Sequence, residues 1–216
     1  MGVNSSKPKI LVFAGSIRAD SYHRKLAQAA AAALRNAGAE VTHADLKDYP
    51  MPLYDGDVEA VQGMPQQARA FKRLLLTHDG FAIASPEYNG SFPALLKNAI
   101  DWTSRPEPGE KPLAAFRGKT ASILSTSPGA GGGQRGLRHL RELLEMIGVR
   151  VLPAQLAIPR AFEAFDARGA LERPEDRNAL ERLASDMVLA LKGAEQAAAY
   201  LPWRLALQSC FTKEDI

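Results

Sequence analysis

The 216-residue chain is poor in cysteine and has no long apolar run. Cys210 is the only cysteine, so the sequence offers neither a disulfide framework nor a dithiol pair, and a reducing, cytoplasmic setting is expected. Without an apolar run of spanning length, and without the basic-then-apolar order of a secretory signal, no membrane partner is expected. The net charge is only +3 and the basic residues are scattered, which argues against a nucleic-acid partner.

Several catalytic signatures are missing as well. The chain contains no G-x-x-x-x-G-K-[ST] loop and no G-x-G-x-x-G fingerprint, the two common glycine-rich nucleotide motifs. Its four histidines lack metal-ligand spacing, so no metal site is expected. The G-x-S-x-G elbow of an α/β-hydrolase is also absent.

The composition that remains is that of a globular domain, with 46% hydrophobic and 24% charged residues. No linker, repeat or low-complexity run divides the chain. We therefore expect a disordered leader over residues 1–8, a single domain over residues 9–201 and a C-terminal tail over residues 202–216.

Short apolar runs alternate with helical patterns along the chain. The runs predict five strands, and the 3.6-residue spacing of apolar side chains predicts the helices between them. The expected strands are 9–14, 39–44, 80–85, 118–126 and 149–152 with an extension at 156–158, and the expected helices cover 26–34, 66–77, the stretch from Pro93, 137–147 and 174–200. The proline-containing stretch 47–63 is expected to be irregular.

This alternation predicts an α/β fold with a five-stranded parallel sheet, strand order 2-1-3-4-5, and helices on both faces. In such sheets ligands bind beyond the carboxyl ends of the strands, where the strand order reverses. Three chemically unusual loops follow the first, third and fourth strands, which are neighbours in this order. We expect these loops to form one cleft.

The loop after the first strand, residues 15–23, reads GSIRADSYH. Its hydroxyls, one guanidinium and the free N–H groups of a helix start are the groups that hold a phosphate dianion. The alternative interpretation is structural, with Ser21 as an ordinary helix N-cap and Arg18 solvated.

The loop after the third strand begins SPEYNGSFP at Ser85. Asn89 and Gly90 tolerate positive φ and predict a tight turn beside one exposed ring, Tyr88. This loop is either a seat for a planar, polar ligand or an ordinary turn with a surface tyrosine. With the glycine-rich loop 127–133 the cleft suits a ligand that has a phosphate at one end and a flat ring at the other, such as FMN.

The three motifs together resemble the NADPH-dependent FMN reductase family. The resemblance is carried by the loop 15–27, by the stretch 85–93 with LKNAIDW after it, and by Ser127-Pro128-Gly129 with Gly132-Gly133. It implies a flavodoxin-like fold, FMN as cofactor and NADPH or NADH as co-substrate. It also implies that hydride passes to FMN and electrons pass on, in ping-pong fashion, to a small-molecule acceptor such as a quinone, azo compound, metal oxyanion or free flavin.

The resemblance also assigns cofactor-binding residues. It places the FMN phosphate on the first loop and the ring edge on the second, with Ser127 approaching from the fourth strand; the set is Ser16, Arg18, Ser21, Tyr22, His23, Pro86, Glu87, Tyr88, Asn89, Gly90 and Ser127. At His23 the family more often has Asn, although a neutral imidazole can also donate one hydrogen bond. No catalytic acid or base is implied, because the chemistry belongs to the flavin.

Some alternatives stay open. A flavodoxin-type electron carrier would bind FMN without nicotinamide activity, but such carriers are acidic and this chain is mildly basic. The resemblance implies a homodimer or a homotetramer, and Trp102 is either an interface anchor or a core residue. Phe162 and Phe165 either cover a ligand or anchor a loop. The acceptor, the nicotinamide preference, the subunit number and the role of Cys210 leave no readable pattern.

Overall fold

The computed structural model of the chain describes residues 6–199, with side chains described as far as residue 194. The predicted strands and helices are all present, with boundaries shifted by a few residues. In chain order the elements are β1 (Lys9–Ala14), α1 (Tyr22–Asn36), β2 (Glu40–Ala44), η1 (Leu46–Asp48), α2 (Gly56–Gln62), α3 (Gln66–Thr77), β3 (Gly80–Ala84), α4 (Ala94–Ser104), β4 (Thr120–Thr126), α5 (Gln134–Met146), β5 (Arg150–Val151), β6 (Leu156–Ile158), η2 (Ala161–Glu163) and α6 (Pro174–Ala199).

The strands form one parallel sheet in the order β2-β1-β3-β4-β5, so the predicted topology is confirmed. The fifth strand is split, because β5 and β6 both pair with β4, at Thr120 and at Leu124 respectively. Pro153 lies between the two pieces and has no N–H to donate, which accounts for a break in the ladder at this point. The sheet therefore keeps its order while its edge gains a bend next to the site.

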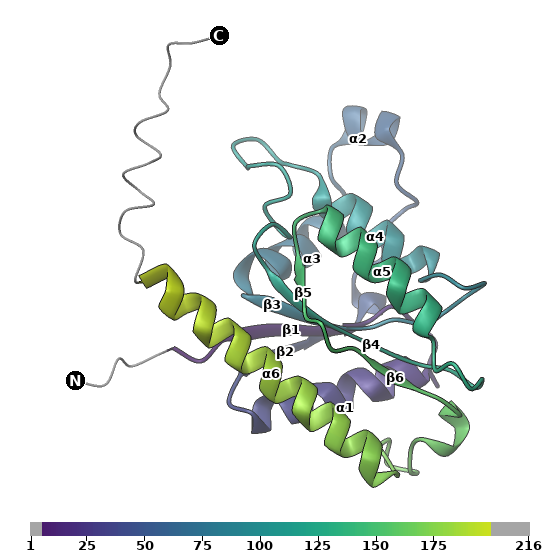
Figure 1. The fold of residues 1–216 in the computed structure, drawn as a ribbon. Helices are drawn as coiled ribbons and strands as arrows, with labels where there is room; N and C mark the ends of the chain where they lie inside the picture. The colour runs from purple at the N-terminus through teal and green to yellow at the C-terminus, as the bar shows by residue number, and fades with distance from the viewer. Residues whose placement is uncertain (1–5, 200–216) are drawn as a thin grey trace.

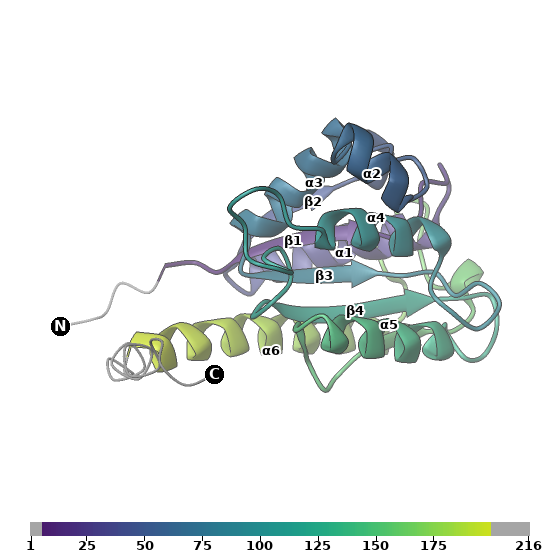
Figure 2. The ribbon, with the colours of Figure 1, turned by 90° about the horizontal axis from the view of Figure 1, so that it is seen from above.

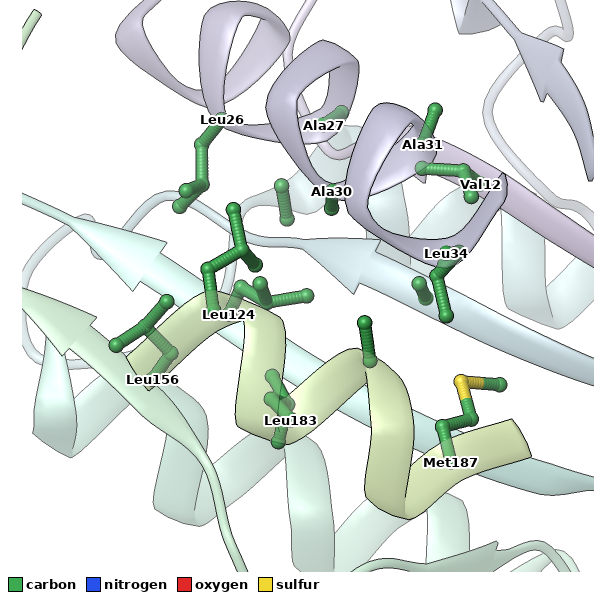
Figure 3. Packing of buried hydrophobic residues seen from close by; sticks show 14 of the residues in the cluster. Val12, Leu26, Ala27, Ala30, Ala31, Leu34, Leu124, Leu156, Leu183 and Met187 are labelled. Carbon is green, nitrogen blue, oxygen red and sulfur yellow. The ribbon is translucent and has the colours of Figure 1, made fainter. Parts of the chain in front are cut away.

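Helices cover both faces of the sheet. The central strands β1, β3 and β4 are therefore buried along nearly their whole length. Ile10 and Val12 point to the side of α1 and α6, while Leu11 and Phe13 point to the side of α3, α4 and α5. Figure 3 shows the first of these layers, in which side chains of α1 and α6 meet Leu124 of β4. Figure 2 shows the strands running in parallel toward one edge.

The stretch expected to be irregular, residues 47–63, contains a helix, so that prediction was wrong. α2 begins at an N-cap, Asp55, whose side chain accepts from the N–H of Asp57, and ends at Gly63 with φ 71°. α2 has no buried residue, so its sequence lacks the periodic apolar side chains from which a helix is predicted. Instead, polar contacts hold its base: Glu59 accepts from the Tyr54 hydroxyl (2.9 Å) and pairs with Arg105 (2.9 Å).

Trp102 is a core residue. Its side chain is fully buried, packs edge-on against Tyr54 with 5.0 Å between ring centroids, and donates its indole N–H to the carbonyl of Pro52 at 2.8 Å. A buried ring presents no surface to a second subunit, so the interface-anchor interpretation was wrong for this residue. Its role is to fix the segment before α2.

The predicted tail lies wholly outside the described residues, together with Cys210 and the first part of the predicted leader. Pro8, the last residue of the predicted leader, is buried, and its carbonyl accepts from the N–H of Glu40 at 2.9 Å. None of the helices in the part of the chain that the structure describes has the length and apolarity needed to cross a lipid bilayer.

Candidate functional site

The three unusual loops meet at the carboxyl edge of the sheet, as predicted. Gly15 donates its N–H to the carbonyl of Ala84 (2.9 Å), and Ser85 donates to the carbonyl of Leu124 (2.8 Å), so the loops start side by side. Gly15 also allows close contact, because a Cβ there would lie 3.3 Å from Pro86 Cδ. The buried Pro86 therefore packs the second loop directly against the first.

Two buried serines shape the loop after β1. Ser16 Oγ accepts from the N–H of Arg18 (3.4 Å), and Ser21 Oγ caps α1 by accepting from the N–H of His23 (3.2 Å). A hydroxyl that accepts one hydrogen bond still has its own hydrogen to donate. Both serines can thus serve the fold and an anion together, so the cap and phosphate interpretations of Ser21 are compatible.

The same loop carries backbone donors that the protein does not use. Among the described residues, the N–H groups of Ile17, Ala19, Asp20 and Tyr22 have no hydrogen-bond partner. They surround the N-terminus of α1, where the helix dipole favours negative charge. Arg18 is exposed within this loop and can add a guanidinium. A phosphate dianion fits this set of donors.

His23 lies at the base of the loop and faces β4. Its Nε2 accepts from the N–H of Thr126 (3.3 Å), which leaves the proton of a neutral ring on Nδ1. Burial lowers the pKa of His23 to about 4. The ring is therefore neutral at pH 7, and Nδ1–H has no partner among residues 6–199. His23 can therefore still donate one hydrogen bond from Nδ1, as the Asn more common at this position in the family could from its amide.

The side chain of Tyr22 has a structural role. Its ring stacks on Phe165 with 6.0 Å between centroids and 13° between planes, and the Lys25 ammonium lies 5.6 Å from its centroid. Phe165 is partly buried against the core, so it anchors its loop, while Phe162 is 59% exposed. The N–H of Tyr22 is the group that stays without a partner among the described residues.

The loop after β3 ends in the predicted tight turn. Tyr88 and Ser91 exchange two backbone hydrogen bonds of 2.8 and 3.0 Å, and the residues between them, Asn89 and Gly90, have φ of 51° and 80°. Positive φ at both central positions is the type I′ pattern. The turn leaves Tyr88 52% exposed.

Glu87 has a role that the sequence pattern does not indicate. Its carboxylate accepts from the N–H of Gly136 in the first turn of α5 (3.0 Å) and from Arg135 Nε (3.1 Å). These bonds, led by that from Gly136, lower the pKa of Glu87. The charge of Glu87 thus caps a helix, and its own N–H has no partner in the described chain.

The glycine-rich loop after β4 is tightly packed. Gly133 has φ 91°, and a Cβ there would lie 2.0 Å from Ser125 Oγ; a Cβ on Gly132 would lie 2.7 Å from the carbonyl carbon of Ala157. Ser127 is partly buried, donates its N–H to Ile158 (3.2 Å) and its hydroxyl to Gly129 (3.4 Å). The structure therefore gathers all the predicted site residues at one edge.

Comparison with known proteins agrees with this arrangement. The family model described as NADPH-dependent FMN reductase matches residues 8–163. An NAD(P)H-dependent FMN reductase of Pseudomonas aeruginosa is 37% identical over 81% of this chain and 90% of its own length. A 2-hydroxy-1,4-benzoquinone reductase of a Burkholderia species is 34% identical over 80% of this chain and 90% of its own.

A solved structure is similar as well. The flavoenzyme NAD(P)H:(acceptor) oxidoreductase from Paracoccus denitrificans superposes with a TM-score of 0.74 at 26% identity, covering 86% of this chain and 98% of the other. The matched family region contains all three loops of the site. From its sequence, fold and site geometry, the chain belongs to the NADPH-dependent FMN reductase family.

Proposed function

We propose that the chain catalyses FMN-dependent oxidation of NADPH or NADH coupled to reduction of a small-molecule acceptor, with a quinone as the first acceptor to test. The observation that supports this most is the open N-terminus of α1, whose unused N–H and hydroxyl donors belong to the loop that packs against Pro86 through Gly15. Family membership and the printed activities of the relatives support the same proposal.

In this proposal the first loop binds the phosphate. Ser16 and Ser21 donate their hydroxyl hydrogens, Arg18 supplies a charge, Tyr22 donates its N–H and His23 donates from Nδ1. The serine hydroxyls, the N–H of Tyr22 and the ring of His23 are held by the loop, by the helix cap or by β4 before the ligand arrives. Little ordering cost is left for binding.

The second and third loops hold the ring. Pro86 is buried and fixes the loop, the N–H of Glu87 donates to the polar edge of the ring, and Tyr88, Asn89 and Gly90 form its outer side. Ser127 approaches from β4. When bound, FMN supplies the hydride-accepting and electron-donating chemistry that no side chain of the site has.

No side chain is assigned as an acid or base. Glu87 is held ionised by the α5 N-terminus, and burial keeps the ring of His23 neutral. The residues of the site bind and orient, and they leave proton transfer to solvent. Quinones, azo compounds, metal oxyanions and free flavin remain the proposed acceptors.

The test is the absorbance spectrum of the FMN-reconstituted protein under anaerobic conditions, recorded before and after stoichiometric NADPH, NADH and then a small quinone. Rapid bleaching of the flavin band by a nicotinamide, reversed by the quinone, is the expected result and gives the donor preference. Bound FMN that neither nicotinamide bleaches would favour an electron carrier. Absence of flavin binding would overturn both.

We also propose a cytoplasmic location, from the single cysteine, and a homodimer or homotetramer, from the family resemblance. Light scattering on the purified chain tests the assembly. A monomer at all concentrations would overturn that part alone.

A further inference from the structure

The side chain of Arg24 binds backbone carbonyls of the loop after β1. Its side chain reaches from the first turn of α1, where Nη1 donates to the carbonyl oxygens of Arg18 (3.3 Å) and Ala19 (3.4 Å). Its other terminal nitrogen, Nη2, forms an ion pair with Asp45, which follows β2. One planar guanidinium thus ties α1, the loop and the end of β2 together.

The two carbonyls fix two backbone donors. In a planar trans peptide the C=O and N–H point in opposite directions. The carbonyl of Arg18 shares its peptide with the N–H of Ala19, and the carbonyl of Ala19 shares its peptide with the N–H of Asp20. These two N–H groups therefore point away from Arg24, and both lack a partner in the described part of the chain.

Asp45 holds Arg24 in place. Its Oδ2 takes the ion pair, while its Oδ1 accepts from the N–H of Lys47 (3.0 Å) and caps η1. The carboxylate is thus fixed by the backbone after β2, and it cancels the charge of the guanidinium near the loop. Arg24 consequently acts by geometry more than by net charge.

We propose that Arg24 is a positioning residue for the phosphate-binding loop, held by Asp45, and that it acts by aiming the N–H groups of Ala19 and Asp20. The inference rests on the proposed binding of FMN at this loop. It adds two residues that touch no ligand to the set that determines affinity for the phosphate.

The test compares FMN with riboflavin, which has the same ring and no phosphate. Fluorescence titration gives Kd for both ligands in the wild-type chain and in the variants Arg24→Lys, Arg24→Gln and Asp45→Asn. We expect Kd for FMN to rise about tenfold in all three variants, the scale of one well-placed hydrogen bond to a charged group. Kd for riboflavin should change less than about twofold, because the ring lies elsewhere.

A pure charge effect predicts a different pattern. Arg24→Lys would then bind FMN like the wild type, and Asp45→Asn would bind it more tightly, because a negative charge near the phosphate is removed. Either result would overturn the positioning role. A general loss of folding would raise Kd for both ligands alike, so an unchanged ratio of the two Kd values would also count against it.

Arg35→Gln is the matched control. Arg35 lies in the last turn of the same helix and also donates to a backbone carbonyl, that of Val41 at 3.2 Å. Its removal should leave the FMN-to-riboflavin ratio unchanged. If the wild-type chain bound no FMN at all, the proposed function would fail, whereas FMN binding with an unaltered ratio in the Arg24 variants would reject only the present inference.

Discussion

The N-termini of α1 and α5 differ, although both helices begin at the same sheet edge after a loop that follows an inner strand. The first turn of α5 is closed by the protein itself. The N–H of Gln134 donates to Gly131 (3.1 Å), that of Leu137 to Gly133 (3.2 Å), and that of Gly136 to the carboxylate of Glu87 (3.0 Å).

The start of α1 is more open: Arg24 and Lys25 donate to the carbonyl of Ser21 (3.1 and 3.2 Å), but the N–H of Tyr22 is free among the described residues. Ser21 Oγ takes the N–H of His23, while Tyr22 and the loop residues Ala19 and Asp20 keep their donors free within the described residues. Both helices have a dipole, so the dipole alone does not distinguish the proposed phosphate site at α1 from the start of α5. What distinguishes the two helix starts is the carboxylate of Glu87, which already accepts a hydrogen bond from the first turn of α5 and so takes the place of an external anion there.

The largest expected effect comes from damaging the closed terminus. Gly133→Ala places a Cβ 2.0 Å from Ser125 Oγ at φ 91°, so both strain and overlap oppose it. We expect a loss of about 3 kcal/mol or more in the free energy of unfolding, measured by urea denaturation. Gly131→Ala is the control, since its Cβ meets nothing within 4 Å. Equal losses in both variants would show that the loop is merely sensitive to alanine.

The next effect tests whether α1 attracts phosphate through a charged histidine. Folding lowers the pKa of His23 from 6.5 to about 4, so the unfolded chain binds the extra proton between these values and stability falls as pH drops through this window. From pH 7 to pH 5 the ligand-free wild type should lose about 2 kcal/mol through this residue.

His23→Asn should remove most of that loss, measured by urea denaturation at both pH values. His139→Asn, at an exposed position of α5, should keep it. A His23→Asn variant with the full pH dependence would mean that folding does not lower the pKa of His23, so that the imidazole becomes charged in mildly acidic solution. The preference for α1 would then include a charge, and the comparison would no longer rest on N–H donors alone.

The open terminus was largely predictable from local sequence, and the closed one was not. A buried strand followed by GSIRADS indicates a Ser/Arg loop at a helix start. The dipeptide Asn89-Gly90 likewise predicts a tight turn with positive φ at both residues, as the structure has it. These signals are local because backbone conformation and helix caps depend on neighbouring residues. Alternation and apolar runs predict a parallel sheet, and 2-1-3-4-5 is a common strand order for such a sheet.

The side chains that join the loops have no local signature. Glu87 caps a turn 49 residues away, and Arg24 meets Asp45 across 21 residues. Such pairs exist only after the sheet has brought the loops together, so no spacing rule marks them. α2 was not predicted for a different reason: it has no buried residue, Val58 packs only partly buried against the cluster around Trp102, and Glu59 makes polar contacts, so the helix shows no periodic apolar face.

The smallest effect sharpens the comparison most. Glu87→Ala removes the cap of α5 and should cost about 1 kcal/mol in the free energy of unfolding at pH 7, while Glu87→Gln keeps an accepting oxygen and should cost less. The lowered pKa of Glu87 means that its stabilisation is present above the ordinary carboxyl range and is lost as pH falls through the lower folded value, so both variants should lack this acid-side loss.

Uncapping also leaves the N–H of Gly136 free, which makes α5 resemble α1. Added sulfate should therefore raise the unfolding midpoint of Glu87→Ala more than that of Glu145→Gln, which removes an exposed carboxylate of the same helix. Equal sulfate responses would show that Glu87 is not what keeps anions from α5.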